Sequence, residues 1–236
     1  MRTLDNQKIL VTGGTGSFGK KFVNYVLKNF KPKKLIIFSR DELKQYEMQN
    51  QLKSFKRSLR FFLGDVRDLD RLHLAMRDVD LVVHAAALKH VESGEYNPFE
   101  VVKTNVLGTQ NIIDAIVNSN VKKGVFLSTD KAVSPINLYG ATKLAAEKIF
   151  IAANNYSLKK FSVVKYGNVF NSRGSVLPFF IKQIQNNEAI TITDKKMTRF
   201  NISLETGVKF VISSMLNMEG GETFIPKMDT IKIMDL

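Results

Sequence analysis

The residues Thr12-Gly13-Gly14-Thr15-Gly16-Ser17-Phe18-Gly19 come directly after an apolar run and open an amphipathic segment. Gly14, Gly16 and Gly19 satisfy the dinucleotide-binding fingerprint, and Gly13, Gly16 and Gly19 satisfy a common variant of it. In such a turn one glycine makes the bend, Gly16 lets the backbone approach a pyrophosphate, and Gly19 packs the helix against the strand. The stretch therefore predicts a strand–turn–helix unit whose helix N-terminus binds the phosphates of a dinucleotide.

Apolar, β-branched runs alternate with amphipathic stretches along most of the chain. Strands that are hydrophobic almost throughout, separated by helices, indicate a parallel sheet covered on both faces. We therefore expect an α/β fold, a Rossmann doubly wound parallel sheet. The expected strands are Ile9–Thr12, Leu35–Phe38, Arg60–Leu63, Leu81–His84, Gly124–Leu127 and Ser162–Tyr166, and the expected helices are Ser17–Phe30, Asp41–Phe55, Asp68–Arg77, Pro98–Asn118 and Tyr139–Asn155.

The regular alternation weakens after Tyr166. We expect helices at Ser175–Asn187 and Leu204–Asn217, and short strands at Ala189–Thr193 and Thr223–Ile225. The break near Asn168 predicts a cofactor-binding domain over residues 1–168 and a small, incomplete C-terminal substrate lobe over residues 169–236.

The composition restricts the class of protein. The chain has 236 residues, a net charge of +13 and no cysteine, which excludes disulfides and suits a reducing cytoplasm. The lysine clusters at Lys31–Lys34, Lys53–Arg60 and Lys159–Lys160 lack interleaved aromatic residues, so we expect solvated loops rather than a nucleic-acid or membrane surface. We expect no metal, because His73, His84 and His90 lack the spacing of a ligand cluster.

The end of the second predicted strand indicates which dinucleotide binds. Ser39-Arg40 stands where an NAD site would carry an acid, and a hydroxyl with a guanidinium suits the 2′-phosphate of NADP. Asp41 follows and is an alternative NAD acid, but the role of helix N-cap explains it better. Asp65-Val66, after the third strand, is placed to meet the adenine, and the segment His84–Ala87 offers small residues near the nicotinamide ribose.

Two tyrosine–lysine pairs with a spacing of four occur, Tyr139…Lys143 and Tyr156…Lys160. Residues four apart share a helix face, and an ammonium group lowers the pKa of a neighbouring tyrosine, which makes it a proton acceptor. Tyr139…Lys143 follows a polar strand end, Ser128-Thr129-Asp130-Lys131, whereas no such strand end accompanies the second pair. We therefore expect Tyr139 and Lys143 to be catalytic and the other pair to lie on the surface.

Asp130-Lys131 adds an acid and a base beside the expected redox centre. Oxidation at one carbon acidifies the neighbouring C–H bond, so a base can remove that proton while an acid helps a hydroxyl group leave. The pair thus favours elimination of water beside a transient ketone. The alternative is a salt-bridged loop.

At this point several segments together resemble a known family, the UDP-N-acetylglucosamine 4,6-dehydratases of the extended short-chain dehydrogenase/reductase group. The similarity is greatest to the configuration-inverting enzymes of pseudaminic acid biosynthesis. The segments that carry the resemblance are TGGTGSFG (12–19), SRDELKQ (39–45), GDVRD (64–68), HAAALKHV (84–91), KTNVLGTQN (103–111), STDKAVSPINLYGATK (128–143), YGNVFNSRGSVLPFF (166–180) and MTRFNISLE (197–205).

The resemblance implies a role for each matching residue. Lys131 would remove the C5 proton of the sugar, Asp130 would assist departure of the C6 hydroxyl, and Thr129 would hydrogen-bond near O4. Tyr139 and Lys143 would serve C4 oxidation and hold the nicotinamide ribose. The NADP-lining residues would be Gly13, Gly16, Ser17, Phe18, Gly19, Ser39, Arg40, Asp41, Lys44, Asp65, Val66, Ala85, Lys89, Asn105 and Val169, and the UDP-sugar would meet Asn168, Arg173, Thr193 and Arg199.

We therefore expect a cytoplasmic, NADP-dependent UDP-N-acetylglucosamine 4,6-dehydratase that inverts C5 and forms a homo-oligomer. A retaining dehydratase or a sugar-nucleotide 4-epimerase would share the glycine turn and the Tyr139/Lys143 pair, although an epimerase has less use for Asp130-Lys131. An NADP-binding scaffold or sensor without turnover is the alternative from another class. The family continues beyond Leu236, so we expect the substrate lobe to lack part of its UDP-binding surface.

Overall fold

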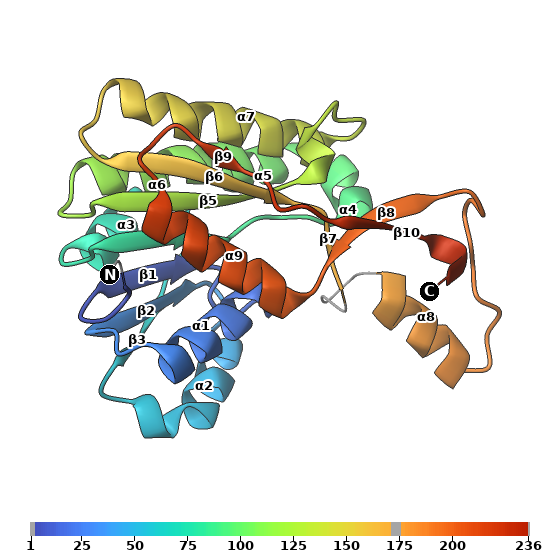
Figure 1. Ribbon diagram of the computed structural model, residues 1–236, viewed down its shortest axis with the longest axis horizontal. Coiled ribbons are helices and arrows are strands. Elements are labelled where there is room, and N and C mark those ends of the chain that lie inside the picture. Colours follow the sequence, from blue (N-terminus) through green and yellow to red (C-terminus); the bar gives the residue numbers. More distant parts are fainter. Residues whose placement is uncertain (1–2, 171–175, 236) are drawn as a thin grey trace.

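The computed structural model describes residues 3–170 and 176–235, and its main feature is a seven-stranded sheet in the order β3-β2-β1-β4-β5-β6-β9 (Figure 1). All six neighbouring pairs in this sheet are parallel. The order reverses beside β1, which is the point where doubly wound sheets bind ligands at the carboxyl ends of their strands. The predicted fold class is confirmed.

The strands of the large sheet are where the apolar runs predicted them, and in its central strands the side chains on both faces are buried. In β1 every residue after Lys8 is buried, and in β4 every residue is. The seven strands are β1 (Lys8–Thr12), β2 (Lys34–Ser39), β3 (Leu59–Leu63), β4 (Leu81–His84), β5 (Lys123–Thr129), β6 (Lys160–Tyr166) and β9 (Thr223–Phe224).

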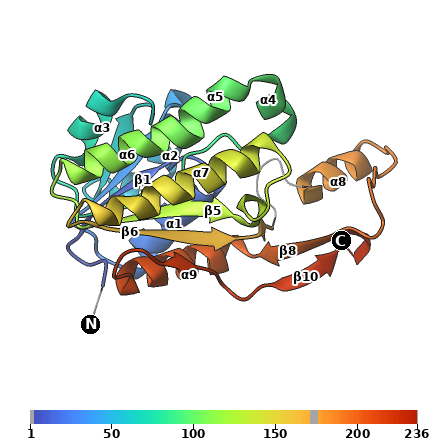
Figure 2. The ribbon, with the colours of Figure 1, turned by 90° about the horizontal axis from the view of Figure 1, so that it is seen from above.

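Helices cover both faces of the sheet, in two layers that Figure 2 shows edge-on. One apolar cluster joins one face of the strands to α1, α2 and α9, and a second cluster joins the other face to α3, α6 and α7. This alternation of faces is the doubly wound arrangement. The bounds are α1 (Ser17–Asn29), α2 (Glu42–Gln51), α3 (Leu69–Met76), α6 (Gly108–Val117), α7 (Leu138–Ala152) and α9 (Leu204–Asn217).

The predicted helix Pro98–Asn118 is helical throughout but changes its winding. It begins as α5 (Pro98–Val102), widens into the π-helical segment η2 (Lys103–Leu107) and continues as α6. A π-helical turn rotates the side chains that it carries and is frequent at functional sites. Here it places Asn105 in the interior, 2% exposed. The short helix α4 (Val91–Tyr96), which precedes α5, was not predicted.

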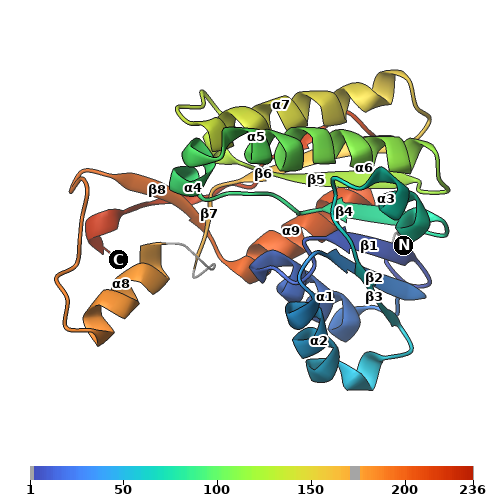
Figure 3. The ribbon, with the colours of Figure 1, turned by 180° about the vertical axis from the view of Figure 1, so that it is seen from behind.

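A second, three-stranded sheet in the order β10-β8-β7 projects with α8 (Val176–Gln185) from one end of the molecule (Figure 3). Residues 204–225 return to the large sheet, because α9 packs in its core and β9 pairs with β6. The expected lobe, residues 169–236, is therefore shared between the two sheets. The strands of the small sheet are β7 (Asn168–Val169), β8 (Thr198–Ile202) and β10 (Asp229–Lys232).

The expected strand Ala189–Thr193 is wrong: this segment is irregular, although its residues alternate like a strand. The side chain of Gln183, on α8, makes hydrogen bonds to the backbone of this segment that a neighbouring strand would otherwise make. Its amide nitrogen donates to the Ala189 carbonyl at 3.0 Å, and its amide oxygen accepts from the Thr191 N–H at 3.3 Å. Thr223–Ile225 is confirmed, as β9.

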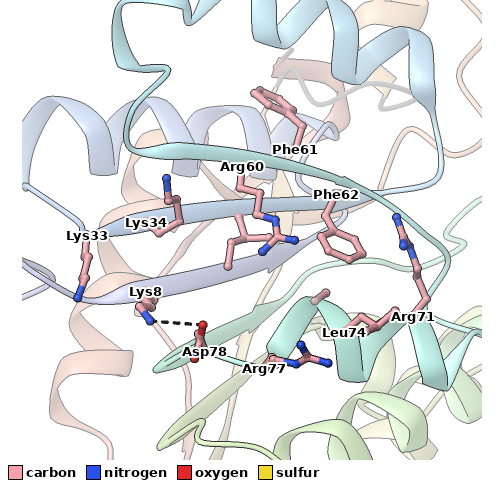
Figure 4. Close-up of a pocket in the computed structure, with 12 residues that line it drawn as sticks. Lys8, Lys33, Lys34, Arg60, Phe61, Phe62, Arg71, Leu74, Arg77 and Asp78 are labelled. Atoms are coloured by element: carbon pink, nitrogen blue, oxygen red, sulfur yellow. Dashed lines mark ion pairs between the residues drawn. The ribbon is translucent and has the colours of Figure 1, made fainter.

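Basic residues from two of the predicted clusters line a groove of about 700 Å³ beside the amino ends of β1, β2 and β3 (Figure 4). Lys8 pairs with Asp78 at 3.8 Å, and the guanidinium groups of Arg60 and Arg71 lie 5.0 and 4.1 Å from the centre of the Phe62 ring. The glycine turn follows the opposite, carboxyl end of β1, so this groove is not the dinucleotide site.

No helix within the described residues is long and apolar enough to span a bilayer.

His84 is a fully buried residue that ties three elements together at the carboxyl end of β4. Its Nδ1 lies 2.7 Å from the Thr12 hydroxyl of β1, and its Nε2 lies 3.1 Å from the Thr109 hydroxyl of α6. Burial, and then the charge of Lys143, lower the pKa of His84 to about 3. The histidine is thus a neutral structural residue.

His84 should make the fold sensitive to acid. The unfolded chain takes up the proton near pH 6.5 and the folded chain only near pH 3, so the free energy of unfolding should fall as the pH drops below 6.5. The loss should approach about 4 kcal/mol by pH 3. Urea unfolding of His84→Gln between pH 7 and pH 4 should show a correspondingly weaker pH dependence than the native protein. His73→Gln, on α3, is the matched control, and equal behaviour of the two variants would contradict this role.

Candidate functional site

The glycine turn is packed tightly against its neighbours. Gly13 adopts φ 63°, and a Cβ atom there would lie 3.0 Å from the backbone of Ala86. A Cβ on Gly19 would lie 2.5 Å from the backbone of Gly14, so only glycine allows α1 to pack this closely against the turn. Both positions need glycine for reasons of space.

The N-terminus of α1 is oriented to receive an anion. Gly16 is the N-cap residue and supplies no side-chain hydrogen bond, and the first turn, which begins with Ser17 and Phe18, contains no acidic residue. The N–H groups and the positive end of the helix dipole at such a terminus bind phosphate. The tight glycine turn and this helix N-terminus, which has no side-chain cap, together fit the pyrophosphate of a dinucleotide.

At the end of β2 the predicted cations are paired with carboxylates. Arg40 lies 3.4 Å from Asp65, and Lys44 pairs with Asp41. Asp41 accepts a hydrogen bond from the Lys44 N–H at 2.9 Å, which confirms the N-cap role given to it. Ser39 is buried, and its hydroxyl accepts from the Gln45 amide at 3.0 Å.

The expected adenine contacts, Asp65 and Val66, are already engaged with the protein. Burial raises the pKa of Asp65, but hydrogen bonds from Arg67 and the charge of Arg40 outweigh it and hold that pKa below its usual value. Val66 is 4% exposed and belongs to the apolar core, and its carbonyl accepts from the Asn111 amide at 3.1 Å. An adenine would therefore meet the edge of this segment rather than the Val66 side chain.

The segment after β4 is held from both sides. The Thr12 hydroxyl accepts from the N–H groups of Ala85 and Ala86 at 3.1 and 3.2 Å. Asn105 donates to the Leu88 carbonyl at 2.9 Å and accepts from the Leu88 N–H at 2.8 Å. Asn105 thus holds the backbone of Leu88 in place.

Lys89, the next residue, is one of the expected NADP contacts. Partial burial, and then the charge of Lys131, lower its pKa.

The predicted catalytic residues gather at the carboxyl end of β5. The Thr129 hydroxyl donates to Asp130 at 2.9 Å. Tyr139 lies near enough to Thr129 for Thr129 to lower its pKa. The Lys131 ammonium donates to Asp130 at 2.7 Å and also to the amide oxygen of Asn168 on β7. The structure therefore brings Thr129 of β5, Asp130 and Lys131 of the turn that follows it, Tyr139 of α7 and Asn168 of β7 together.

Gly140 is a position important to the site that was not predicted from the sequence. A Cβ atom there would lie 2.2 Å from the Lys131 carbonyl oxygen, so only glycine lets α7 approach the Asp130–Ala132 turn. The start of α7 is fixed by the Asn137 side chain, which accepts from the Gly140 N–H at 2.9 Å, and by Glu95, which accepts from the Leu138 N–H at 2.8 Å. The sequence signal that could have identified this position is the glycine directly after Tyr139.

The structure reverses the expected direction of the pKa shift at Tyr139. Burial raises this pKa to about 12; the hydrogen bond with Thr129 lowers it, and the Asp130 charge raises it. Lys143 does not supply the expected opposing charge, because its ammonium is turned toward the sheet and donates to the Leu127 carbonyl at 2.5 Å. Burial lowers the pKa of Lys143 to about 7, and the Glu147 carboxylate partly offsets this.

The structure places the remaining predicted residues in different environments. Tyr156, of the rival pair, is 61% exposed on the surface. Val169 packs against the core beside Asn168, whereas Thr193 lies exposed between α8 and β8. Arg199 is half-buried on β8 and donates to the Thr198 carbonyl at 2.9 Å. Arg173 lies outside the described residues. Among those residues, no group of three histidine, cysteine or acidic side chains could hold a metal ion.

Comparison with known proteins identifies the family to which the chain belongs. The model of the family described as "Polysaccharide biosynthesis protein" matches residues 9–236. A UDP-N-acetylglucosamine 4,6-dehydratase (inverting) from Campylobacter jejuni subsp. jejuni serotype O:23/36 (strain 81-176) is 58% identical over 98% of this chain and 70% of its own length. A UDP-glucose 4-epimerase from Rickettsia bellii (strain OSU 85-389) is 44% identical over 94% of this chain and 66% of its own length.

Solved structures show the same architecture. The X-ray structure of Pen from Bacillus thuringiensis superimposes with a TM-score of 0.94 at 45% identity, over 98% of this chain and 72% of that one. A dTDP-glucose 4,6-dehydratase from Streptomyces venezuelae, DesIV, shares the fold with a TM-score of 0.88 at 22% identity, over 97% of this chain and 78% of that one. The resemblance found in the sequence is confirmed, and the chain belongs to the polysaccharide biosynthesis protein family that includes the inverting UDP-N-acetylglucosamine 4,6-dehydratases.

Proposed function

We propose that this protein is an NADP-dependent UDP-N-acetylglucosamine 4,6-dehydratase that inverts C5 and serves pseudaminic acid biosynthesis. The observation that carries the proposal is the cluster at the carboxyl end of β5, where the Thr129 hydroxyl and the Lys131 ammonium both donate to Asp130 and Tyr139 lies near Thr129. It combines a redox tyrosine with an acid and a base, which elimination beside a transient ketone requires. Identity of 58% to an inverting enzyme supports the same substrate and outcome.

The dinucleotide would be held by residues already described: the glycine turn and α1 at the pyrophosphate, and Ser39 and Arg40 at the 2′-phosphate. When bound, it supplies the hydride acceptor for C4 and the hydride donor for C6. Tyr139 takes the proton of the C4 hydroxyl, with Thr129 hydrogen-bonded beside it. The Lys143 ammonium must turn from Leu127 toward Tyr139, because positive charge there favours tyrosinate.

The Asp130/Lys131 ion pair explains how one site can supply both an acid and a base. Transfer of one proton along the 2.7 Å hydrogen bond converts ammonium and carboxylate into a neutral amine and a carboxylic acid. The amine of Lys131 then removes the C5 proton, and the acid of Asp130 protonates the departing C6 hydroxyl, so that water leaves. Asn168 holds the Lys131 side chain during this exchange. The charges of the site are the same before and after elimination.

Three other functions remain as outcomes of the test. A 4-epimerase would return the hydride to C4, and a retaining dehydratase would keep the C5 configuration. A scaffold that only binds NADP would leave the sugar unchanged. Incubating the purified protein with NADP and UDP-N-acetylglucosamine, with the product followed by NMR, distinguishes them. We expect a 4-keto-6-deoxy sugar with inverted C5, and a 4-epimer or unchanged substrate would refute the proposal.

Arg40 should set the preference for NADP over NAD. Arg40→Ala removes a charge-assisted contact to the 2′-phosphate, which contributes roughly 1.5–3 kcal/mol, so the affinity for NADP should fall by about 10-fold or more. The affinity for NAD should hardly change. Calorimetric titration with both dinucleotides measures this, with Lys53→Ala, beyond α2, as the control. Equal affinity of the native protein for the two would contradict the assignment.

Tyr139 should be needed for oxidation but not for cofactor binding. Tyr139→Phe keeps the ring and removes the proton acceptor, so C4 oxidation should slow by about 10²–10⁴-fold while NADP still binds. Single-turnover absorbance of the reduced nicotinamide follows this step. The same substitution at the exposed Tyr156 is the control and should have almost no effect. Similar losses in both variants would remove the role given to Tyr139.

Lys131 should be the base at C5. In deuterated water the native protein should place solvent deuterium at C5, and Lys131→Ala should lose this exchange with NADP affinity nearly intact. Lys148→Ala, exposed on α7, is the control. Proton NMR of the recovered sugar nucleotide reports the label. Undiminished exchange in the Lys131 variant would deprive that residue of its role, whereas absence of exchange in the native protein would favour an epimerase.

A further inference from the structure

A third polar residue continues the catalytic face of α7. Tyr139, Lys143 and Glu147 follow one another at intervals of four residues, so their side chains lie along one side of the helix. Lys143 and Glu147 are buried, with 4% and 6% exposure. The proposed reaction uses the first two residues and gives no task to Glu147. A buried carboxylate is costly unless it is paired, so its presence needs a reason.

Two partners hold the Glu147 carboxylate in a fixed position. The Ser128 hydroxyl of β5 donates to Oε1, and the Lys165 ammonium of β6 lies 2.9 Å from Oε2. The side chains of this ion pair are 13% and 8% exposed for Lys165 and Glu147, so solvent screens it little. The Glu147 carboxylate is thereby anchored to β5 and β6, near the carboxyl end of β5.

The neighbouring Lys143 has few groups that stabilise its charge. Its ammonium donates to the Leu127 carbonyl at 2.5 Å and lies 3.8 Å from the centre of the Phe126 ring. Burial lowers its pKa to about 7, and Glu147 is the carboxylate that opposes this shift. Neutral and charged Lys143 are therefore close to balance at neutral pH, where a single nearby charge decides which form prevails.

The other titratable groups around Lys143 do not replace Glu147. His84, on β4, has a pKa of about 3 and is uncharged at neutral pH. On β6, Tyr166 has a raised pKa and is neutral, and Lys165 is a cation that would repel the ammonium. Asp130, beyond β5, is paired with Lys131. Glu147 is thus the carboxylate placed to act on Lys143.

We propose that Glu147, anchored by Ser128 and Lys165, is a positioning residue that keeps the buried Lys143 side chain in its ammonium form for the redox step. This inference rests on the proposed function, because that function gives Lys143 its task. Lys165 tempers the effect by competing for the same carboxylate. The two members of the pair should therefore act on Lys143 in opposite directions.

The ionisation of Lys143 can be measured directly, without substrate. In protein labelled with ¹³C- and ¹⁵N-lysine, the Cε resonance that Lys143→Met abolishes reports the titration midpoint. Glu147→Gln should lower that midpoint by about one pH unit, a tenfold change in the ratio of charged to neutral lysine at a given pH. Lys165→Met should raise it, since the repelling cation is lost and the carboxylate is freed. Glu188→Gln, exposed after α8, should leave it unchanged.

A loss of packing would move the midpoint in the same direction in both single variants, so opposite shifts identify an electrostatic role. If Glu147→Gln fails to fold, the double variant Glu147→Gln/Lys165→Met replaces it, and its midpoint should lie below that of Lys165→Met. An unchanged midpoint, or shifts in one direction, would overturn the proposal.

The same coupling should appear in turnover. In Glu147→Gln, the alkaline limb of the rate of C4 oxidation should move to lower pH by the shift that NMR records, with KM nearly unchanged. If the NMR shifts occur and UDP-N-acetylglucosamine is not converted by the native protein, the proposed function fails while the Glu147–Lys143 coupling stands. If conversion occurs and the alkaline limb stays in place, Glu147 has no part in the reaction.

Discussion

Burial of the parallel sheet on both faces is the constraint on which the rest of the molecule depends. Strands such as β1 and β4 have no solvent-exposed face, so their side chains serve packing and polar chemistry is confined to the strand ends. The carboxyl ends of β1, β2, β4 and β5 meet along one edge, where the glycine turn, Arg40, His84 and Asp130 follow. The cofactor cradle and the candidate catalytic cluster are therefore neighbours because the sheet is parallel.

At this edge of the sheet, neighbouring backbone segments approach one another closely, and three glycines make this possible. Gly13 lets the first turn pass beside Ala86, Gly19 lets α1 pack on Gly14, and Gly140 lets α7 reach the Lys131 carbonyl. A methyl group at the last position would push the helix that carries Tyr139 away from the Asp130–Ala132 turn. Local conformation and active-site geometry are thus set by the same residues.

Burying polar groups at this edge lowers the stability of the fold, but it provides groups that can bind or exchange a proton. His84 remains neutral because burial makes its charged form costly, and it joins β1 to α6 through two hydroxyls. Lys143 is buried against β5 and retains its charge with the help of a carboxylate that is itself fixed by two strands. A hydrocarbon side chain at either position would pack at lower cost but could not bind or exchange a proton.

The sequence by itself determined the strands of the large sheet up to β6, the glycine turn, and the position of Tyr139 beside the polar end of β5 with Tyr156 on the surface. Periodicity, glycine spacing and a polar strand end are local features, so they can be recognised along the chain. Only the tertiary structure decided that Gln183 satisfies the backbone where a strand was expected, and that residues 204–225 belong to the large sheet. It also decided that Lys143 faces Leu127 and Glu147 rather than Tyr139. These outcomes depend on which distant groups meet in the interior, and the charge balance of buried residues follows from those contacts rather than from their order in the chain.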